Sequence, residues 1–120
     1  MTHILIIDDE KPIRLMLRKL LESQGYIVTE ASDGTEGLKR YQEHPADLII
    51  TDIIMPDKEG VETIIALKKQ NPDIKIIAMS GGGKNKPEGY LRTAKLLGAK
   101  ETFEKPIRKE KLLQTIKNLI

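Results

Sequence analysis

Cysteine is absent from this 120-residue chain. Without cysteine the protein has no disulfide, no thiolate metal ligand and no cysteine nucleophile, so any metal site must use oxygen or imidazole ligands. Long hydrophobic runs are also missing, because the first apolar run, Ile4 to Ile7, is followed directly by Asp8, Asp9 and Glu10. This pattern excludes a transmembrane helix and a signal peptide. We therefore expect a soluble, cytoplasmic protein that has no membrane partner.

Aromatic residues are scarce as well, at 3% of the chain, and the charge is nearly balanced, with 20 Lys or Arg against 18 Asp or Glu. The charge is uneven along the chain: residues 1–60 hold 7 basic and 12 acidic residues, and residues 61–120 hold 13 and 6. The basic residues are spread through amphipathic segments and do not form a single run. With few rings available for base stacking, the composition argues against a nucleic-acid partner.

Short apolar runs alternate with segments of helical periodicity from end to end. The apolar runs predict strands at residues 4–7, 26–30, 48–50, 74–79 and 101–104. The spacing of apolar residues predicts one helix that begins near Pro12 and four more around residues 36–41, 61–67, 91–97 and 112–120. Strands joined through helices run parallel, with helices on both faces of the sheet. We therefore expect an α/β fold, a doubly wound five-stranded parallel sheet, in one domain over residues 1–120.

In such sheets, ligands bind outside the carboxyl ends of the strands, so the residues after each apolar run form the candidate site. Those residues are Asp8, Asp9 and Glu10, then Asp52, then Ser80 with three glycines, then Lys105 and Pro106. Carboxylates this close repel one another, and Mg²⁺ is a natural cation to hold them ionised together. A metal, a lysine and a hydroxyl can then bind phosphoryl oxygens while a carboxylate attacks phosphorus.

Structural explanations compete with these roles. A single aspartate after a strand is often a helix cap, but the combination of carboxylates, hydroxyl and ammonium at strand ends favours a site. We expect Gly60 and Gly98 to serve turns or helix ends. We expect His3 and His44 to be surface or strand-edge residues and not ligands.

The sequence resembles the receiver domain of two-component response regulators over essentially the whole chain. The matching motifs are residues 4–10, Thr51-Asp52-Ile53-Ile54-Met55-Pro56 with Gly60, Met79-Ser80-Gly81, and Gly98-Ala99 leading to Lys105-Pro106. The resemblance implies a flavodoxin-like (βα)5 fold. It also implies a phosphoacceptor signalling protein, which catalyses only its own phosphorylation and dephosphorylation and is not otherwise an enzyme.

The resemblance further implies a role for each site residue. Asp52 would be the phosphoacceptor, and Ser80 and Lys105 would bind phosphoryl oxygens. The phosphoryl group would come from a phosphohistidine on a sensor histidine kinase or phosphotransfer protein. The Lys105-Pro106 bond would be cis, as in the family. The Mg²⁺ ligands would be Asp8, Asp9, Asp52 and the backbone carbonyl of Ile54.

Two features depart from the family pattern. Thr102 stands where the family usually carries Tyr or Phe, a ring that turns inward on phosphorylation. Phe103 is next along the strand and should point to the opposite face of the sheet. The loop from Ser80 to Gly89 is rich in glycine, so ordering it costs more conformational entropy. We therefore expect this loop, and not an aromatic ring, to respond to phosphorylation.

The resemblance also predicts a docking surface on the fourth helix, fifth strand and fifth helix, because we expect a stand-alone receiver that signals through its own surface. That region is basic, which favours an acidic downstream partner. Its basic residues are Arg92, Lys95, Lys100, Arg108, Lys109, Lys111 and Lys117.

Other interpretations stay open on the residues alone. A small Mg²⁺-dependent aspartyl phosphatase of the haloacid dehalogenase type normally has a second Asp two residues after its nucleophile. Here Glu10 follows Asp8 at that distance, and Ile54 follows Asp52. A flavodoxin-like binding module would need a phosphate loop of bare backbone donors where this chain has an acidic run. A phosphorylation-independent adaptor of the same fold is the non-enzymatic alternative.

Overall fold

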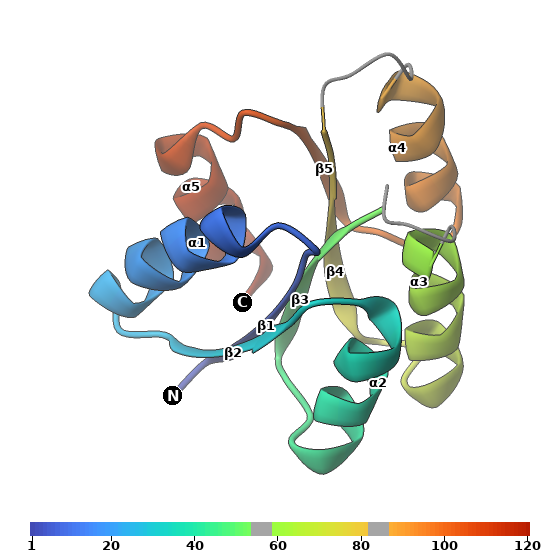
Figure 1. Ribbon diagram of the computed structural model, residues 1–120, viewed down its shortest axis with the longest axis horizontal. Coiled ribbons are helices and arrows are strands. Elements are labelled where there is room, and N and C mark those ends of the chain that lie inside the picture. The colour runs from blue at the N-terminus through green and yellow to red at the C-terminus, as the bar shows by residue number, and fades with distance from the viewer. Residues whose placement is uncertain (54–58, 82–86) are drawn as a thin grey trace.

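The computed structural model describes residues 1–53, 59–81 and 87–120, and within these ranges five strands alternate with five helices (Figure 1). The strands are β1 (His3–Ile7), β2 (Ile27–Ala31), β3 (Leu48–Asp52), β4 (Lys75–Ser80) and β5 (Glu101–Glu104). The helices are α1 (Lys11–Ser23), α2 (Gly34–Glu43), α3 (Glu59–Gln70), α4 (Pro87–Leu96) and α5 (Lys109–Leu119). Every predicted element is present, with ends that differ from the prediction by up to four residues, as at α4, which begins at Pro87 and so takes the last residues of the predicted loop from Ser80 to Gly89 into a helix.

All five strands pair in parallel in the order β2-β1-β3-β4-β5. This is the order of flavodoxin-like doubly wound sheets, in which the direction of winding reverses between β1 and β3. The predicted fold class is therefore confirmed. The reversal leaves the ends of β1 and β3 side by side at the centre of the sheet.

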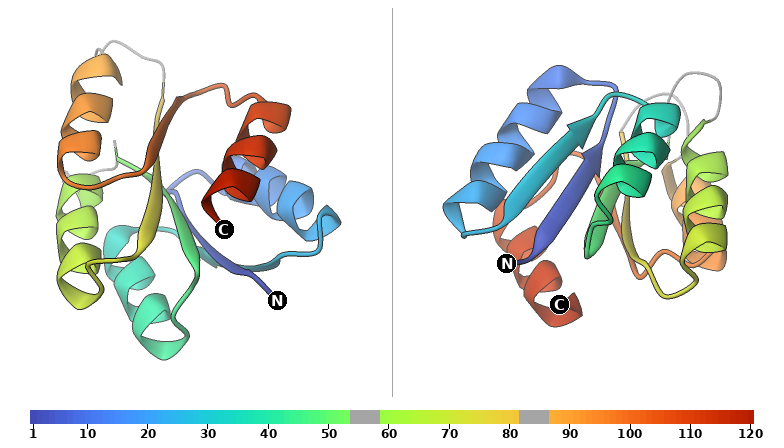
Figure 2. Two further views of the ribbon diagram at one scale, coloured as in Figure 1. Left: turned by 180° about the vertical axis from the view of Figure 1, so that it is seen from behind. Right: turned by 90° about the horizontal axis from the view of Figure 1, so that it is seen from below.

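The helices form two layers, with α1 and α5 on one face of the sheet and α2, α3 and α4 on the other (Figures 1 and 2). Strand side chains alternate between these layers: Ile4 and Ile6 pack with α1 and α5, whereas Leu5 and Ile7 pack on the opposite side. Phe103 is buried in the α1 and α5 layer. Its predicted orientation is thus confirmed, and Phe103 cannot take the place of a ring at position 102.

The start of α2 differs from the prediction by two residues, because a polar cap sets it. The Asp33 side chain accepts a hydrogen bond from the Glu36 amide at 2.7 Å, and the Glu36 side chain accepts one from the Ser32 amide at 2.8 Å. This reciprocal pair resembles a capping box and satisfies amides that would otherwise lack partners. The helix therefore begins at Gly34, before the first apolar residue of its periodic pattern.

Gly60 and Gly98 both lie at helix ends, as expected, but for different reasons. Gly98 follows α4 with φ +116, a conformation that other residues rarely adopt. Gly60 lies in the first turn of α3, where an added Cβ would come within 2.3 Å of the Ile53 Cα. Only glycine allows α3 to approach the end of β3 this closely.

The two histidines lie apart from the strand ends that carry the candidate site. His3 begins β1, with its Nε2 2.6 Å from the Thr29 hydroxyl, and His44 is exposed directly after α2. Within the described ranges, no helix has the length and apolar character needed to cross a bilayer.

Candidate functional site

The carboxyl ends of four strands meet at one edge of the sheet and carry the predicted site residues. Asp8 follows β1, Asp52 ends β3, Ser80 ends β4 and Lys105 follows β5. Asp8, Asp52 and Ser80 are buried, although all three are polar. Buried polar groups persist when they have partners or a function. The structure thus brings Asp8, Asp52 and Lys105 into contact and pairs the backbones of Ser80 and Lys105, while the functional roles of these four residues stay predictions.

Lys105 connects two of the strand ends directly. Its Nζ lies 2.8 Å from Asp8 Oδ2 and 3.1 Å from Asp52 Oδ2, and its side chain is only 10% exposed. One ammonium therefore binds a carboxylate from β1 and a carboxylate from β3, which would otherwise repel each other. The Lys105-Pro106 bond is cis, as predicted.

The acidic residues after β1 form a cluster that is open to solvent on one side. Carboxylate oxygens of Asp8, Asp9 and Glu10 all lie within 4.8 Å of one another, with Asp8 buried and the other two exposed. The Asp8 Oδ1 atom also accepts a hydrogen bond from the Glu10 amide at 2.8 Å. An all-oxygen donor set of this kind suits a hard divalent cation such as Mg²⁺.

The predicted ligand set of Asp8, Asp9, Asp52 and the Ile54 carbonyl stays a prediction, and the structure adds one neighbouring carboxylate to it. Glu10, which the sequence analysis did not assign as a ligand, belongs to the acidic cluster, whereas Asp52 is linked to Asp8 through Lys105. Ile54, whose carbonyl was predicted as a ligand, lies outside the described residues. So do residues 82–86 of the loop between β4 and α4.

Burial and ion pairing act together on the charges of the site. Burial raises the pKa of Asp8 above its ordinary value, although hydrogen bonds from Lys105 and the Glu10 amide oppose this. Burial also acts to lower the pKa of Lys105, but the hydrogen bond to Asp8 and the charge of Asp52 outweigh burial and raise that pKa. Lys105 therefore stays protonated. Burial makes the ionised form of Asp8 less favourable, and a bound cation would stabilise that form.

Ser80 contributes a buried hydroxyl at the end of β4. Its Oγ is buried and has no hydrogen-bond partner among the described residues. A buried hydroxyl without a partner costs about 1–3 kcal/mol. The backbone carbonyl of Ser80 accepts the Lys105 amide at 2.8 Å, which ties the ends of β4 and β5 together. Among the described residues, the Ser80 hydroxyl therefore stays available as a hydrogen-bond donor at the same end of the sheet as Lys105 and the two carboxylates.

The family model of the response regulator receiver domain matches residues 4–117. This chain belongs to that family. Receiver domains act in two-component phosphoacceptor signalling and are signalling proteins, not enzymes of the ordinary kind. They use Mg²⁺ at an acidic pocket, and the cluster of Asp8, Asp9 and Glu10 is consistent with that use.

Individual receiver proteins support the assignment along nearly the full chain. The chemotaxis protein CheY of Bacillus subtilis is 32% identical over 118 residues, which cover 97% of this chain and 96% of CheY. The response regulator receiver protein CpdR of Brucella abortus is 38% identical over 81 residues, 68% of each chain. A receiver domain protein from Clostridium thermocellum has a crystal structure with TM-score 0.91 and 34% identity, covering 100% of this chain and 94% of that one.

Two residues that support the receiver site, Arg14 and Glu30, were not among the predicted site residues. Arg14 of α1 donates from Nη1 to the Asp8 backbone carbonyl at 2.7 Å, and its Nε lies 3.3 Å from Glu30 Oε1. Arg14 appears in the sequence as one basic residue of an amphipathic helix. Nothing in the local pattern indicates that its partner is a backbone carbonyl six residues earlier.

Proposed function

We propose that Asp52 accepts a phosphoryl group from the phosphohistidine of a sensor histidine kinase or phosphotransfer protein, with residues 1–120 acting as one receiver domain. The observation that carries this proposal is the position of Lys105, whose Nζ binds Asp52 and Asp8 at the ends of β3 and β1. Membership of the receiver family supports it further.

In the proposed transfer, a carboxylate oxygen of Asp52 forms a bond to phosphorus while the phosphorus–nitrogen bond of the phosphohistidine breaks. The electron pair of that bond stays on the imidazole nitrogen, so the products are an acyl phosphate and the kinase histidine. Lys105, 3.1 Å from Asp52 Oδ2, is close enough to pair with a phosphoryl oxygen. The Ser80 hydroxyl, which has no partner in the part of the chain that the structure describes, would donate a hydrogen bond to another phosphoryl oxygen.

A divalent cation would be held by Asp8 and Asp9, together with Asp52 and the Ile54 carbonyl. The all-oxygen donors after β1 support this assignment, and Glu10 lies close enough to join them directly or through water. When bound, Mg²⁺ supplies positive charge that offsets the repulsion between the carboxylates and a phosphoryl group.

The direct test is phosphorylation by a small donor. We expect incubation with acetyl phosphate and Mg²⁺ to add one phosphoryl group, detected by intact mass, and Asp52→Asn to abolish the addition. Asp73→Asn is the matched control, because Asp73 is an exposed aspartate before the amino end of β4, at the opposite side of the sheet from the carboxyl ends that carry the site. Phosphorylation of Asp52→Asn at the parent rate would contradict the assignment.

Two further assays, with a phosphate ester and with a phosphorylated kinase, separate the remaining alternatives. Sustained turnover of an exogenous phosphate ester would favour the aspartyl phosphatase, whereas a single addition followed by slow loss favours the receiver. A folded protein that takes up no phosphoryl group, from acetyl phosphate or from a phosphorylated kinase, would favour the phosphorylation-independent adaptor.

We also propose that the output surface of α4, β5 and α5 binds an acidic partner. All seven basic residues predicted for this region are exposed. Exposed charges of one sign mainly set the encounter rate and orientation of a partner, and salt screens them. Association that ignores ionic strength, or that perturbs amides of α2 instead, would contradict this proposal.

A further inference from the structure

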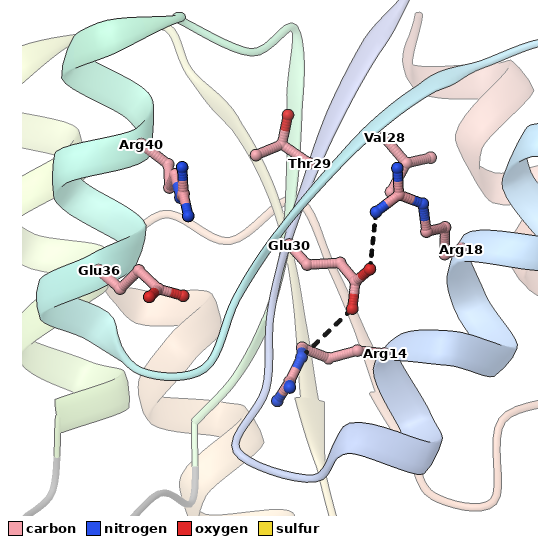
Figure 3. Close-up of a pocket in the computed structure, with 7 residues that line it drawn as sticks. All are labelled: Arg14, Arg18, Val28, Thr29, Glu30, Glu36 and Arg40. Atoms are coloured by element: carbon pink, nitrogen blue, oxygen red, sulfur yellow. Dashed lines mark hydrogen bonds and ion pairs between the residues drawn. The ribbon is translucent and has the colours of Figure 1, made fainter.

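A cluster of charged side chains lies beside β2, one of the two edge strands of the sheet, in a pocket of about 420 Å³ between α1 and α2 (Figure 3). Glu30 of β2 is at its centre. Its Oε1 lies 3.3 Å from Arg14 Nε and its Oε2 lies 2.8 Å from Arg18 Nη1. Because Glu30 pairs with both Arg14 and Arg18, these charges bind one another within the protein.

Arg14 differs from Arg18 in its second partner: Arg18 also pairs with Glu22 of its own helix, whereas Arg14 also contacts the acidic turn after β1. Its Nη1 donates to the backbone carbonyl of Asp8 at 2.7 Å, and the Arg14 side chain is only 15% exposed. The amide of Asp8 donates to the Ala31 carbonyl at 3.1 Å. Both backbone polar groups of Asp8 are therefore hydrogen-bonded: the amide donates to the last residue of β2, and the carbonyl accepts from Arg14.

Asp8 is the first residue of the turn that carries the acidic cluster into α1. The direction of its carbonyl fixes the peptide plane between Asp8 and Asp9, and with it the direction in which the chain leaves β1. We infer that Arg14, itself held by Glu30, is a positioning residue that sets the arrangement of the Asp8, Asp9 and Glu10 carboxylates for a divalent cation. This inference rests on the proposed function for the role of that cation.

Charge alone makes the opposite prediction, which allows a sharp test. Arg14 is a cation near a cation site, so its removal should strengthen Mg²⁺ binding if only electrostatics matters. If Arg14 positions the loop, its removal should weaken binding. Arg18 is the matched control, because it carries the same charge on the same helix and pairs with Glu30, and its other ion pair is with Glu22.

We would titrate Mg²⁺ into the full chain and follow amide shifts for the parent and for Arg14→Ala, Arg14→Lys and Arg18→Ala. Residues that orient metal ligands typically contribute about 10–100-fold to metal affinity, so we expect Arg14→Ala to raise Kd about tenfold. Arg14→Lys keeps the charge but lacks the planar fork, and its Kd should also rise. Arg18→Ala should bind as tightly as the parent or slightly more tightly.

A second measurement in Mg²⁺-free protein tests the positioning itself. The Glu10 amide, which donates to Asp8 Oδ1, should exchange hydrogen faster in Arg14→Ala than in the parent, while Arg18→Ala leaves it unchanged. The core amide of Leu112 in α5 reports whether each variant is folded. If Arg14→Ala does not fold, Arg14→Lys takes its place in both measurements.

The outcomes separate this inference from the proposed function. A parent that binds no Mg²⁺ contradicts the proposed metal site, and the exchange of Glu10 then still decides whether Arg14 positions the loop. Tighter or equal Mg²⁺ binding by folded Arg14 variants, or equal weakening by Arg18→Ala, would overturn the inference. Unchanged exchange at Glu10 in the Arg14 variants would overturn it as well.

Discussion

Lys105 lies between two buried carboxylates that come from different strands, Asp8 after β1 and Asp52 at the end of β3. Removing one partner of a buried ion pair is costly, because the remaining charge loses its compensation without regaining water. At the scale of the residue, Lys105 therefore stabilises the site before any phosphoryl group arrives. A divalent cation at the same strand ends would act on the same carboxylates.

For this reason we expect Lys105→Met to lower the free energy of unfolding by about 3 kcal/mol without Mg²⁺, as for other buried pairs that lose one partner. Mg²⁺ should restore part of this loss. Urea unfolding with and without Mg²⁺ measures both effects, with the exposed Lys117→Met as the control. Equal stability of the two variants would show that the pair contributes nothing.

At the scale of the element, the placement of α3 depends on a single glycine. The first turn of α3 packs against the backbone of Ile53, the residue after Asp52, and leaves no room for a side chain at position 60. A shift of this helix would therefore move the chain directly beside the proposed phosphoacceptor. Gly89 in α4 is different, since an added Cβ would meet nothing within 4 Å.

The two glycines give a matched pair of predictions. Gly60→Ala should destabilise the protein by about 1–3 kcal/mol through overpacking and should slow phosphorylation by acetyl phosphate. Gly89→Ala should stabilise it by about 0.5–1 kcal/mol, because alanine favours a helix interior. Thermal unfolding and phosphorylation rates measure both changes. A Gly60→Ala protein with the stability and rate of the parent would contradict the close packing.

The polar cap of α2 is a second prediction at this scale. Asp33→Ala removes the acceptor of the Glu36 amide and should cost about 1 kcal/mol, whereas Asp33→Asn should cost much less because asparagine caps almost as well. Chemical denaturation of the two variants distinguishes them. Equal losses would mean that the charge of Asp33, and not its hydrogen bond, stabilises the helix.

At the scale of the whole molecule, the parallel sheet concentrates negative charge at one edge. The central position of β1 and β3 brings their carboxylates together, and the folded chain holds this arrangement against electrostatic repulsion. A cation that binds the folded state and not the unfolded chain therefore stabilises the entire protein.

We accordingly expect Mg²⁺ at ten times its Kd to add about 1.4 kcal/mol of stability, which corresponds to a rise in Tm of roughly 5 °C for a chain of this size. Chelation should reverse the rise. Asp9→Ala should lose most of the Mg²⁺ effect, whereas Asp73→Ala should keep it. Calorimetry at constant ionic strength measures these shifts, and a parent Tm that ignores Mg²⁺ would contradict the metal site.

The sequence by itself determined the fold class and most of the site residues. Apolar runs and helical periodicity depend on neighbours a few residues apart, so they located all ten elements. The rule that ligands bind at strand ends then selected Asp8, Asp52, Ser80 and Lys105. Resemblance to receiver domains added the cis bond before Pro106, which the structure confirms.

Only the tertiary structure decided how these residues meet. Lys105 and Asp8 are 97 positions apart, and the distance between them follows from the strand order, which local patterns do not encode. The burial of the Ser80 hydroxyl and the close approach of α3 to Ile53 at Gly60 likewise depend on tertiary packing. So does the hydrogen bond from Arg14 to the Asp8 carbonyl, which joins α1 to the turn that precedes it. Local sequence therefore specified which groups the site contains, and long-range packing specified their distances, burial and partners.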